Sequence, residues 1–443
     1  MITLCDKIHG FVILSNISNF IIEHPLFQRL KGLKQLGTVP VFANVESLLS
    51  ISSSFDLSSW HTRYEHSIGV AHIGKRMALH LQTMLIDNSQ NIHNSQNINL
   101  RKYHILMVEI AGLLHDIGHG PFSHVYDKIA TEVHEQRSQR YAKIVLEDVY
   151  KNVQFQNDCE MLLLFQELFE DNIPISTFID TICYLIEPAM VINDNNDING
   201  HNNIICLDHE LHFLTEIICN VTHGFDVDKF DYLQRDCFYT QKPINTTFEE
   251  CHRRIENIIS KSNVAFCKND IQHNNIQSHV VFDISTSEDI QYLSNVRLEL
   301  YEQVYQTPKA QLCDHLIVEQ MKKMELPSAE LACLVDQDIL DFDQNATREI
   351  IDIVARSVVV EYSSSNVKLS NDNTFNENAI NNNTINLVKP FLVYCSEQMP
   401  WNILHKVSYY CNNIIHNNSH NVKISSYDTD SRKNSELIRE FSW

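Results

Sequence analysis

The stretch from His115 to His124 contains three histidines and Asp116 within ten residues. It follows an almost wholly apolar run, Ile105–Leu114, which predicts a helix that is buried on every side. A buried imidazole or carboxylate needs a partner, and a metal ion can satisfy both groups at once. An isolated His-Asp pair usually caps a core helix, but the additional histidines favour a metal or catalytic site here.

Two further stretches, residues 61–70 and residues 224–236, contain side chains of the same types. With the first stretch they resemble the HD phosphohydrolase superfamily, whose metal-binding pattern is H…HD…D. Imidazole and carboxylate ligands suit a first-row transition metal, or Mg²⁺ on the oxygen side. The resemblance therefore implies a divalent metal (Mg²⁺, Mn²⁺, Fe²⁺ or Zn²⁺), as one ion or two, on the ligands His66, His115, Asp116 and Asp228.

A closer resemblance is to the deoxynucleoside triphosphate triphosphohydrolases, especially those that join a SAM domain to an HD domain. It begins almost at Met1, so no SAM domain is expected, and it continues to about residue 306. It implies a mainly α fold, with an HD helical core in residues 1–311, small β elements, and a short α+β C-terminal lobe in residues 312–443. The similar segments are Phe27–Leu30, Lys34–Gly37, Arg63–Val70, His115–Asp127, His134–Gln136, Asp226–Cys237 and Arg297–Gln306.

The activity that this resemblance implies is metal-dependent hydrolysis of deoxynucleoside triphosphates to deoxynucleoside and inorganic triphosphate. Such chemistry requires charge stabilisation on the phosphate, an activated water and a protonated leaving group. By the resemblance, His124 is the general acid and Asp127 orients it. The implied catalytic side chains are His119, His124, Asp127 and His134.

The implied substrate contacts divide into phosphate, sugar and base. Phosphates would be held by basic and phenolic side chains, and the 3′-hydroxyl by Gln35 and Asp236. Leu36 and Tyr305 would pack where a 2′-hydroxyl would lie, and Gln306 would lie near the base. The full set is Gln35, Leu36, Arg63, Lys229, Tyr232, Asp236, Arg297, Tyr305 and Gln306.

The spacing of three of these residues carries its own prediction. Asp228, Tyr232 and Asp236 recur every four residues, so a helix would place them on one stripe. Phe230 and Leu233 would face elsewhere and pack. His119 lies four residues after His115, but Gly118 and Gly120 make a break in the helix as probable as its continuation.

Composition limits the class of protein. The 443 residues allow one large or two modest domains. The net charge of −22 argues against nucleic acid as the main partner. The sequence has no apolar run of 18 residues and no secretion signal, so neither a membrane span nor secretion is expected. The 12 scattered cysteines indicate reduced thiols in a cytoplasmic or nuclear protein.

Periodicity predicts the remaining elements. Residues 3–14 predict two short strands with a turn at Gly10, whereas Ile21–Leu36 and His61–Leu85 predict helices. Expected core positions of the second helix are Ile68, Ala71, Met77 and Leu79. Short strands are expected near Val280–Phe282, Leu392–Tyr394 and Val407–Tyr410. A Ser-rich insert and four Asn-rich inserts are expected to be loops, at residues 44–59, 87–99, 193–203, 268–277 and 366–386.

Other functions remain open: an HD phosphohydrolase acting on a nucleoside monophosphate or modified nucleotide, and a non-catalytic nucleotide sensor. Loss of a metal ligand would indicate the sensor, and none of the four is lost. In the resembled family, nucleotides bound between subunits assemble a tetramer. Basic residues of that activator site are replaced by Asp283, Ser285 and Asp289, and acidic groups there would repel a triphosphate. The resemblance therefore implies a homodimer, with a tetramer as the alternative.

Overall fold

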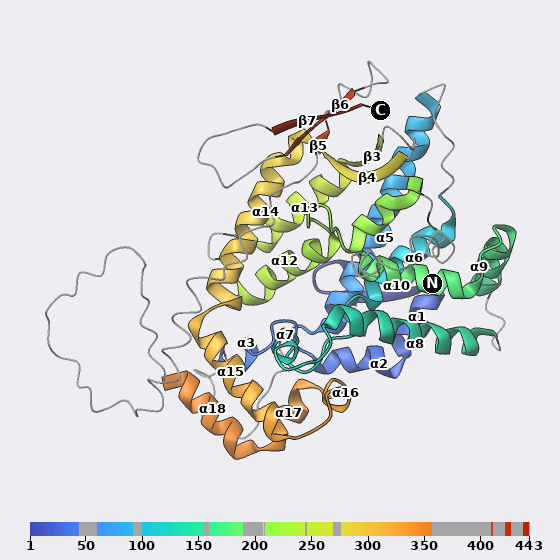
Figure 1. The fold of residues 1–443 in the computed structure, drawn as a ribbon. Coiled ribbons are helices and arrows are strands. Elements are labelled where there is room, and N and C mark those ends of the chain that lie inside the picture. The colour runs from blue at the N-terminus through green and yellow to red at the C-terminus, as the bar shows by residue number, and fades with distance from the viewer. Residues whose placement is uncertain are drawn as a thin grey trace, which may run out of the picture.

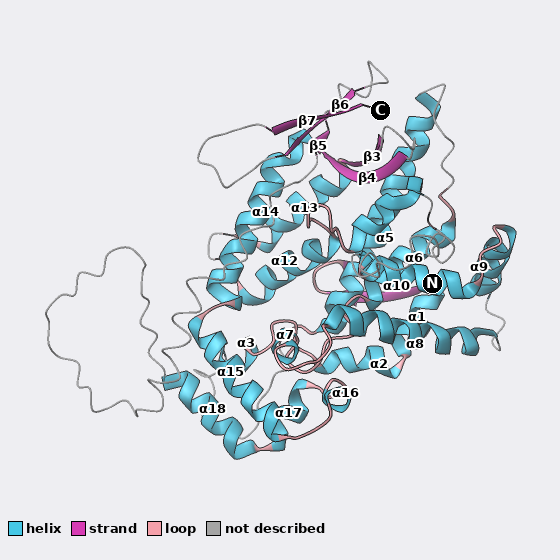
Figure 2. Ribbon diagram, viewed as in Figure 1, coloured by secondary structure: helices cyan, strands magenta, loops and turns pink. Residues whose placement is uncertain are grey.

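Helices make up most of the described chain in the computed structural model (Figures 1 and 2). The structure describes residues 1–43, 60–91, 100–154, 159–188, 207, 209–243, 246–268, 276–356, 409–410, 421–426 and 437–442. The predicted mainly α fold with small β elements is confirmed. No described helix is long and apolar enough to cross a membrane. The predicted loops at residues 193–203 and 366–386, the insert at 44–59, and the strand at Leu392–Tyr394 lie outside the described residues.

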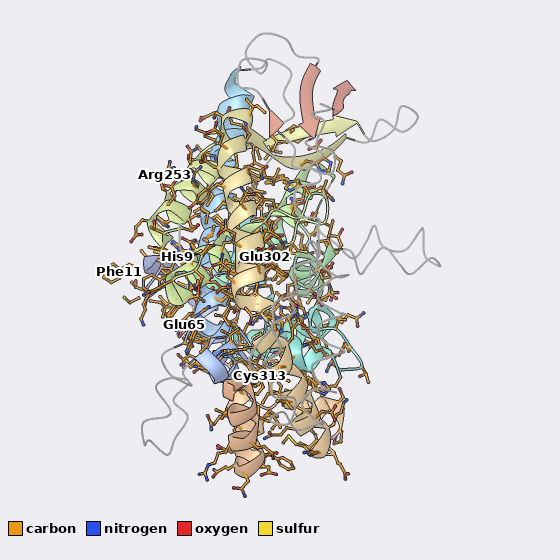
Figure 3. The ribbon with its side chains drawn as sticks, turned by 90° about the vertical axis from the view of Figure 1, so that its left-hand side faces the viewer. His9, Phe11, Glu65, Arg253, Glu302 and Cys313 are labelled. Atoms are coloured by element: carbon orange, nitrogen blue, oxygen red, sulfur yellow. The ribbon has the colours of Figure 1, made fainter. Side chains whose placement is uncertain are left out.

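The chain begins with the predicted hairpin, in which β1 (Ile2–Asp6) pairs antiparallel with β2 (Gly10–Leu14). The Asp6 carboxylate closes the turn by accepting the backbone N–H groups of Ile8 and His9, at 2.8 and 2.9 Å. Gly10 has a φ of +67°, a conformation that favours glycine. One face of the hairpin packs on the core, and the other carries Phe11, which is 78% exposed (Figure 3).

The single helix predicted for Ile21–Leu36 is wrong. The segment contains the end of α1 (Asn16–Glu23), then α2 (Pro25–Gln28) and a 3-10 turn over Arg29–Gly32. Proline disfavours the helical conformation in the residue before it, and His24 is accordingly extended, with φ −67° and ψ 137°. Pro25 then starts α2, where its missing N–H costs nothing.

Two packed helices, α5 (Arg63–Asn91) and α6 (Lys102–Leu114), form the centre of the core. All residues of α6 except Lys102 and Leu106 are buried, as the apolar run predicted. The prediction that Leu79 of α5 is a core residue is wrong, because that residue is 42% exposed. It follows the buried Met77 by two residues, which places it roughly 200° around the helix. Around this pair pack α8 (His134–Gln154), α10 (Ile175–Ile186) and α12 (Val227–Thr240).

The remaining elements of the core surround these helices. The described helices among them are α3 (Val39–Ala43), α7 (His124–Asp127), α9 (Cys159–Glu170), the 3-10 turn His209–Leu214, α11 (Thr215–Ile218), α13 (Phe248–Ser260), the 3-10 turn Ile284–Thr286, α14 (Ser287–Leu300) and the π-helical turn Tyr301–Tyr305.

A small sheet lies beside α13 and α14 (Figure 1). β3 (Ser262–Lys268) pairs antiparallel with β4 (Ile276–Asp283), and β5 (Tyr409–Tyr410) pairs parallel with β4. The strands predicted near Val280–Phe282 and Val407–Tyr410 are therefore present. A further antiparallel pair consists of β6 (Asn421–Ser426) and β7 (Leu437–Ser442).

Two of the predicted Asn-rich loops are shorter than expected. Helix α5 continues to Asn91, into the insert predicted at residues 87–99, and β3 and β4 include both ends of the insert predicted at residues 268–277. A long helix and a paired strand thus extend into polar sequence, because neighbouring hydrogen bonds already hold the backbone.

Four helices form a second apolar cluster with residues 122–126: α15 (Pro308–Lys323), α16 (Ser328–Leu331), α17 (Asp336–Phe342) and α18 (Gln344–Arg356). Leu312, the predicted start of the C-terminal lobe, lies inside α15. The cluster includes Phe122, Val125 and Tyr126. The segment that carries His124 is therefore packed against these C-terminal helices.

The contact between α5 and α6 gives a test of the fold. A Cβ atom on Gly112 would lie 2.8 Å from the backbone Cα of Ala71, which cannot move without shifting α5. Gly112→Ala should therefore destabilise the fold by about 1 to 3 kcal/mol and lower the Tm in thermal unfolding. Gly74→Ala is the control, because its new Cβ would meet side-chain ends, at 3.0 Å from Ile218 and 3.3 Å from Val108. A Gly112→Ala protein as stable as Gly74→Ala would contradict this packing.

Candidate metal centre and catalytic cleft

Three helices bring the four predicted metal ligands together. His66 lies in the first turn of α5, His115 and Asp116 follow the end of α6, and Asp228 lies in the first turn of α12. His66 Nε2 lies 3.1 Å from Asp228 Oδ1 and 3.5 Å from Asp116 Oδ2. His115 Nε2 lies 3.5 Å from Asp116 Oδ1 and 3.6 Å from Asp228 Oδ1. Four donor groups from distant parts of the chain thus converge on one point.

Both histidines use Nδ1 for a hydrogen bond to the protein. His66 Nδ1 lies 2.7 Å from Asp231 Oδ2, and His115 Nδ1 donates to the carbonyl of Gly112 at 2.8 Å. These bonds fix the orientation of each ring and turn Nε2 toward the carboxylates. Buried His115 Nε2 has no hydrogen-bond partner among the described residues. An unpaired ring nitrogen of this kind fits a metal ligand.

The charges of the cluster favour a cation. Burial alone would lower the pKa of His66, but hydrogen bonds to two carboxylates raise it to about 9. Burial opposes the ionisation of Asp116, yet Arg63 beside it holds the pKa of that carboxyl well below its usual range. Burial opposes the ionisation of Asp228 as well, yet the imidazoles of His66 and His115 beside it lower the pKa of that carboxyl. Asp116 and Asp228 therefore stay ionised, and either a protonated histidine or a metal ion can balance their charge.

The donor separations suit a single ion. Ligands about 2.1 Å from one ion lie roughly 3.0 to 3.4 Å from one another in common geometries. The separations of 3.1 to 3.6 Å between nitrogen and oxygen atoms are close to these values. Two imidazoles and two carboxylates suit a first-row transition metal. The residues present therefore fit a divalent metal.

A buried ion-pair network holds Asp231, the carboxylate that orients the His66 ring. The sequence analysis did not predict this network. Arg235 is fully buried and donates to Asp231 at 2.8 and 3.0 Å and to Asp6 at 2.9 Å. His9 Nε2 lies 2.6 Å from Asp231 Oδ1. The only signal in the sequence was the i, i+4 spacing of Asp231 and Arg235, which is common on exposed helices. The network ties the N-terminal hairpin to α5 and α12.

His119, His124 and His134 form a second cluster beside the metal ligands. The rings of His119 and His134 stack with centroids 4.0 Å apart, and that of His124 lies edge-on, 4.9 Å from His119. Burial lowers the pKa of His119 well below its usual range, so its imidazole is neutral. His119 does not continue the helix before His115, because that helix ends at Leu114 and residues 115–118 form a turn.

Asp127 contacts two of these histidines. Its Oδ2 lies 2.8 Å from His134 Nδ1 and 3.5 Å from His124 Nδ1, so it orients His134 more closely than the expected His124. Burial opposes its ionisation, but its histidine neighbours hold the pKa of the Asp127 carboxyl far below its usual range. His119, His124, Asp127 and His134 offer ligand atoms within 4.8 Å of one another, so the alternative of two ions has a defined second donor set.

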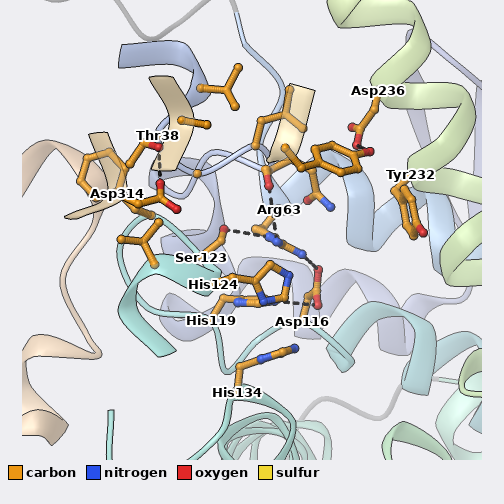
Figure 4. A pocket seen from close by; sticks show the side chains of 18 of the residues that line it. Thr38, Arg63, Asp116, His119, Ser123, His124, His134, Tyr232, Asp236 and Asp314 are labelled. Carbon is orange, nitrogen blue, oxygen red and sulfur yellow. Dashed lines mark hydrogen bonds and ion pairs between the residues drawn. The ribbon is translucent and has the colours of Figure 1, made fainter. Parts of the chain in front are cut away.

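A cavity of about 480 Å³ opens beside both clusters (Figure 4). Most of the predicted site residues line it. His66, His115 and Asp127 lie behind its wall. The predicted residues on its surface are Gln35, Leu36, Arg63, Asp116, His119, His124, His134, Asp228, Tyr232, Asp236, Arg297, Tyr305 and Gln306.

Lys229 does not line the cavity, although it was expected to bind phosphate. Its ammonium lies 3.0 Å from a carboxylate oxygen of Asp226, the residue that caps α12. The cap carboxylate is three residues away on the same helix, so this local pair forms without a substrate. Two other cations, Arg63 and Arg297, do line the cavity.

One wall of the cavity has a hydrogen-bonded carboxylate. Tyr305 donates its hydroxyl to Asp236 Oδ2 at 2.5 Å, and His61 Nε2 lies 2.7 Å from Asp236 Oδ1. Burial raises the pKa of Tyr305 well above its usual range, so the phenol keeps its proton. Nearby, Arg297 Nε donates to the Tyr232 hydroxyl at 2.7 Å. His61 was not predicted as a site residue, because its partner lies 175 residues away.

The loop between His119 and His124 has an unusual backbone. Phe122 and Ser123 both have positive φ, 56° and 57°, which is rare outside glycine. Asp336 of α17 accepts the Phe122 N–H at 2.6 Å, and Arg63 Nε donates to Ser123 Oγ at 3.0 Å. Long-range bonds thus hold this loop in a strained conformation, as is common near functional sites.

Comparison with known proteins agrees with the geometry. Residues 63–177 match the HD domain family. Deoxynucleoside triphosphate triphosphohydrolase SAMHD1 of Danio rerio is 31% identical over 237 residues, which cover 53% of this chain and 33% of that protein. SAMHD1 of Homo sapiens is 27% identical over 246 residues, 53% of this chain and 32% of that protein. An HD domain-containing protein of Acanthamoeba polyphaga mimivirus is 26% identical over 317 residues, which cover 70% of this chain and 55% of that protein. The matched part of the chain spans about a third of each SAMHD1 protein.

The network behind His66 predicts a metal-binding phenotype. Asp231→Asn should weaken the binding of Mn²⁺ about 10- to 100-fold, because His66 loses the carboxylate that orients its ring. Isothermal titration of metal-stripped protein measures this. Asp6→Asn is the matched control: it also removes a carboxylate from Arg235, but it does not contact His66. Equal Mn²⁺ affinities in the two variants would contradict the assignment.

The raised pKa of His66 predicts proton release on metal binding. With a pKa of about 9, His66 is protonated in the metal-free protein at pH 7.5 and must lose that proton to become a ligand. Titration in buffers of different ionisation enthalpy should therefore show release of at least about one proton per ion. The apparent affinity should rise with pH up to about 9 and then level off. Metal binding without proton release at pH 7.5 would contradict this description of the site.

Proposed function

Because this chain is an HD-domain protein that resembles the deoxynucleoside triphosphate triphosphohydrolases, we propose that it hydrolyses deoxynucleoside triphosphates to deoxynucleoside and inorganic triphosphate. The observation that carries the proposal is one cavity with two features. Asp116 and Asp228 of a complete metal donor set lie on its wall, and so does the Tyr305–Asp236 pair. Phosphate and sugar would thus be bound side by side.

The phosphate end is defined by charge. Arg63 lies between the donor set and the cavity, with Nη1 2.5 Å from Asp116 Oδ2 and Nε bonded to Ser123. It is thereby oriented to bind oxygens of the α-phosphate, and Arg297 binds those further along the chain of phosphates. A divalent ion held by His66, His115, Asp116 and Asp228 would supply positive charge to the phosphate and lower the pKa of its water.

The sugar end is defined by shape and hydrogen bonding. Both oxygens of Asp236 keep an additional lone pair beside their bonds to His61 and Tyr305, so the carboxylate can accept a 3′-hydroxyl. Leu36 and the Tyr305 ring are apolar walls of the cavity. A 2′-hydroxyl placed against them would lose its bonds to water without a replacement, which disfavours ribonucleotides.

The histidine cluster supplies the proton for the leaving group. A water oxygen forms a bond to the α-phosphorus and releases one proton to solvent, and the bond from that phosphorus to O5′ breaks. His124, which is 68% exposed at the cavity mouth, donates a proton to O5′. Asp127 stays ionised between His124 and His134 and stabilises their protonated forms. This arrangement supports direct release of the intact triphosphate.

A second candidate, hydrolysis of a nucleoside monophosphate, is favoured by Lys229. Its pairing with Asp226 removes one of the cations expected to bind a triphosphate. The products distinguish the two candidates, because a monophosphate substrate yields orthophosphate.

The test is a product assay on purified protein with each of the four deoxynucleoside triphosphates and GTP, in Mg²⁺, Mn²⁺ or Fe²⁺. Deoxynucleoside and inorganic triphosphate are expected in equal amounts, with slower turnover of GTP. His115→Ala with Asp116→Ala should reduce the rate by at least about a thousandfold. The matched control, His24→Ala with Asp148→Ala, removes an ion pair of the same types away from the cavity and should keep the wild-type rate. An active His115/Asp116 variant would overturn the proposal.

A further inference from the structure

The cavity continues past the expected sugar site into a polar end that the proposed chemistry does not use. Thr38, Lys128 and Asp314 line it there. The Thr38 hydroxyl donates to Asp314 Oδ1, and Lys128 Nζ lies 2.7 Å from Asp314 Oδ2. The Asp314 side chain is 18% exposed, so it is sheltered but open to the cavity. We call these three residues the Asp314 cluster.

Three segments that line the cavity connect expected nucleotide contacts to the Asp314 cluster. Leu36 and Thr38 are separated only by Gly37, whose φ is +56° and whose Cβ position would lie 3.0 Å from the carbonyl oxygen of Phe122. His124 precedes Lys128 by four residues, about one helical turn. Along the third wall, Gln306, Ala310 and Asp314 follow one another at four-residue spacing. The segments that carry Leu36, His124 and Gln306 therefore also carry the three residues of the Asp314 cluster.

The position of the cluster matches the place of the base in a nucleotide. The base leaves the sugar at C1′, across the ring from C3′. Figure 4 shows Thr38 and Asp314 on one side of the histidines, and Asp236, the expected 3′-hydroxyl acceptor, on the other. A sugar whose C3′ faces Asp236 would direct its base toward Asp314.

The walls of this end suit a flat ring. Val39, Val125 and Ala310 are buried apolar residues that line the cavity, whereas the cluster supplies hydrogen-bonding groups. Ligand sites commonly combine apolar walls with a few fixed polar groups that determine specificity. A carboxylate presents two acceptor oxygens, and Lys128 beside it presents donors.

We propose that the Asp314 cluster is the base subsite and that it selects guanine. This inference rests on the proposed function, because it needs a nucleotide in the cavity. Guanine offers N1–H and the 2-amino group side by side as donors to the Asp314 carboxylate, and its O6 accepts from Lys128. Adenine presents an acceptor at N1, and the pyrimidines lack a 2-amino donor. A charged, two-bond contact of this kind discriminates strongly between bases.

The test compares dGTP with dITP, which differs only in lacking the 2-amino group. The wild type should show a kcat/KM for dGTP at least about tenfold above that for dITP. Asp314→Asn should reduce this ratio to roughly 1 to 3, because the amide offers one acceptor in place of two. Glu319→Gln is the matched control: it removes one negative charge from the exposed part of the same helix and should keep the wild-type ratio. Equal kcat/KM for dGTP and dITP in the wild type, or an unchanged ratio in Asp314→Asn, would overturn the inference.

Equilibrium binding separates this inference from the proposed function. If no triphosphate is released from any substrate, the proposed chemistry fails, and the affinities for dGTP and dITP still test the base subsite. Titration of the 443-residue chain with each nucleotide in EDTA should show tighter binding of dGTP, and Asp314→Asn should abolish the difference. Equal affinities of the wild type for both nucleotides would overturn the assignment of the base subsite whatever the assay of turnover shows.

Discussion

The site depends on one buried ion-pair network, in which the guanidinium of Arg235 lies between Asp6 and Asp231. Asp231 in turn orients His66. Removing Arg235 would leave two buried carboxylates without the cation they share, which is strongly destabilising. The space is also filled, because a Cβ atom on Gly69 would overlap the Asp231 carboxylate. The hairpin, α5 and α12 are therefore held in one relative position, and that position sets where the His66 imidazole points.

Charge is distributed so that a protein of strongly negative net charge can bind an anion. The carboxylates Asp116 and Asp228 lie close together, and their negative charges need a cation beside them. Arg63 and Arg297 line the adjoining cavity, and the neighbouring His119 imidazole is neutral. Local pairing, and not the overall charge, therefore decides what the cavity can hold. The same logic applies at its far end, where Asp314 is balanced by Lys128.

Features set by local sequence could be predicted, whereas features set by long-range contacts could not. The buried helix α6 and the stripe of Asp228, Tyr232 and Asp236 follow from periodicity alone. By contrast, Asp336 supports the Phe122 backbone across 214 residues, and no spacing reveals that pair. Local chemistry also caused an error. Pro25 interrupted a predicted helix. The Lys229 ammonium, expected to bind phosphate, pairs with the cap residue Asp226 of α12, and its role with a substrate stays a prediction.

The central claim is that water attacks the α-phosphorus and that the nucleotide loses its three phosphates as one unit. Hydrolysis of dGTP in ¹⁸O-labelled water, followed by mass spectrometry of both products, tests this directly. The account predicts one ¹⁸O atom in the inorganic triphosphate and none in deoxyguanosine, because the bond between phosphorus and O5′ is the one that breaks. Label in the 5′-hydroxyl of deoxyguanosine, or in orthophosphate released alongside a nucleoside diphosphate, would contradict it.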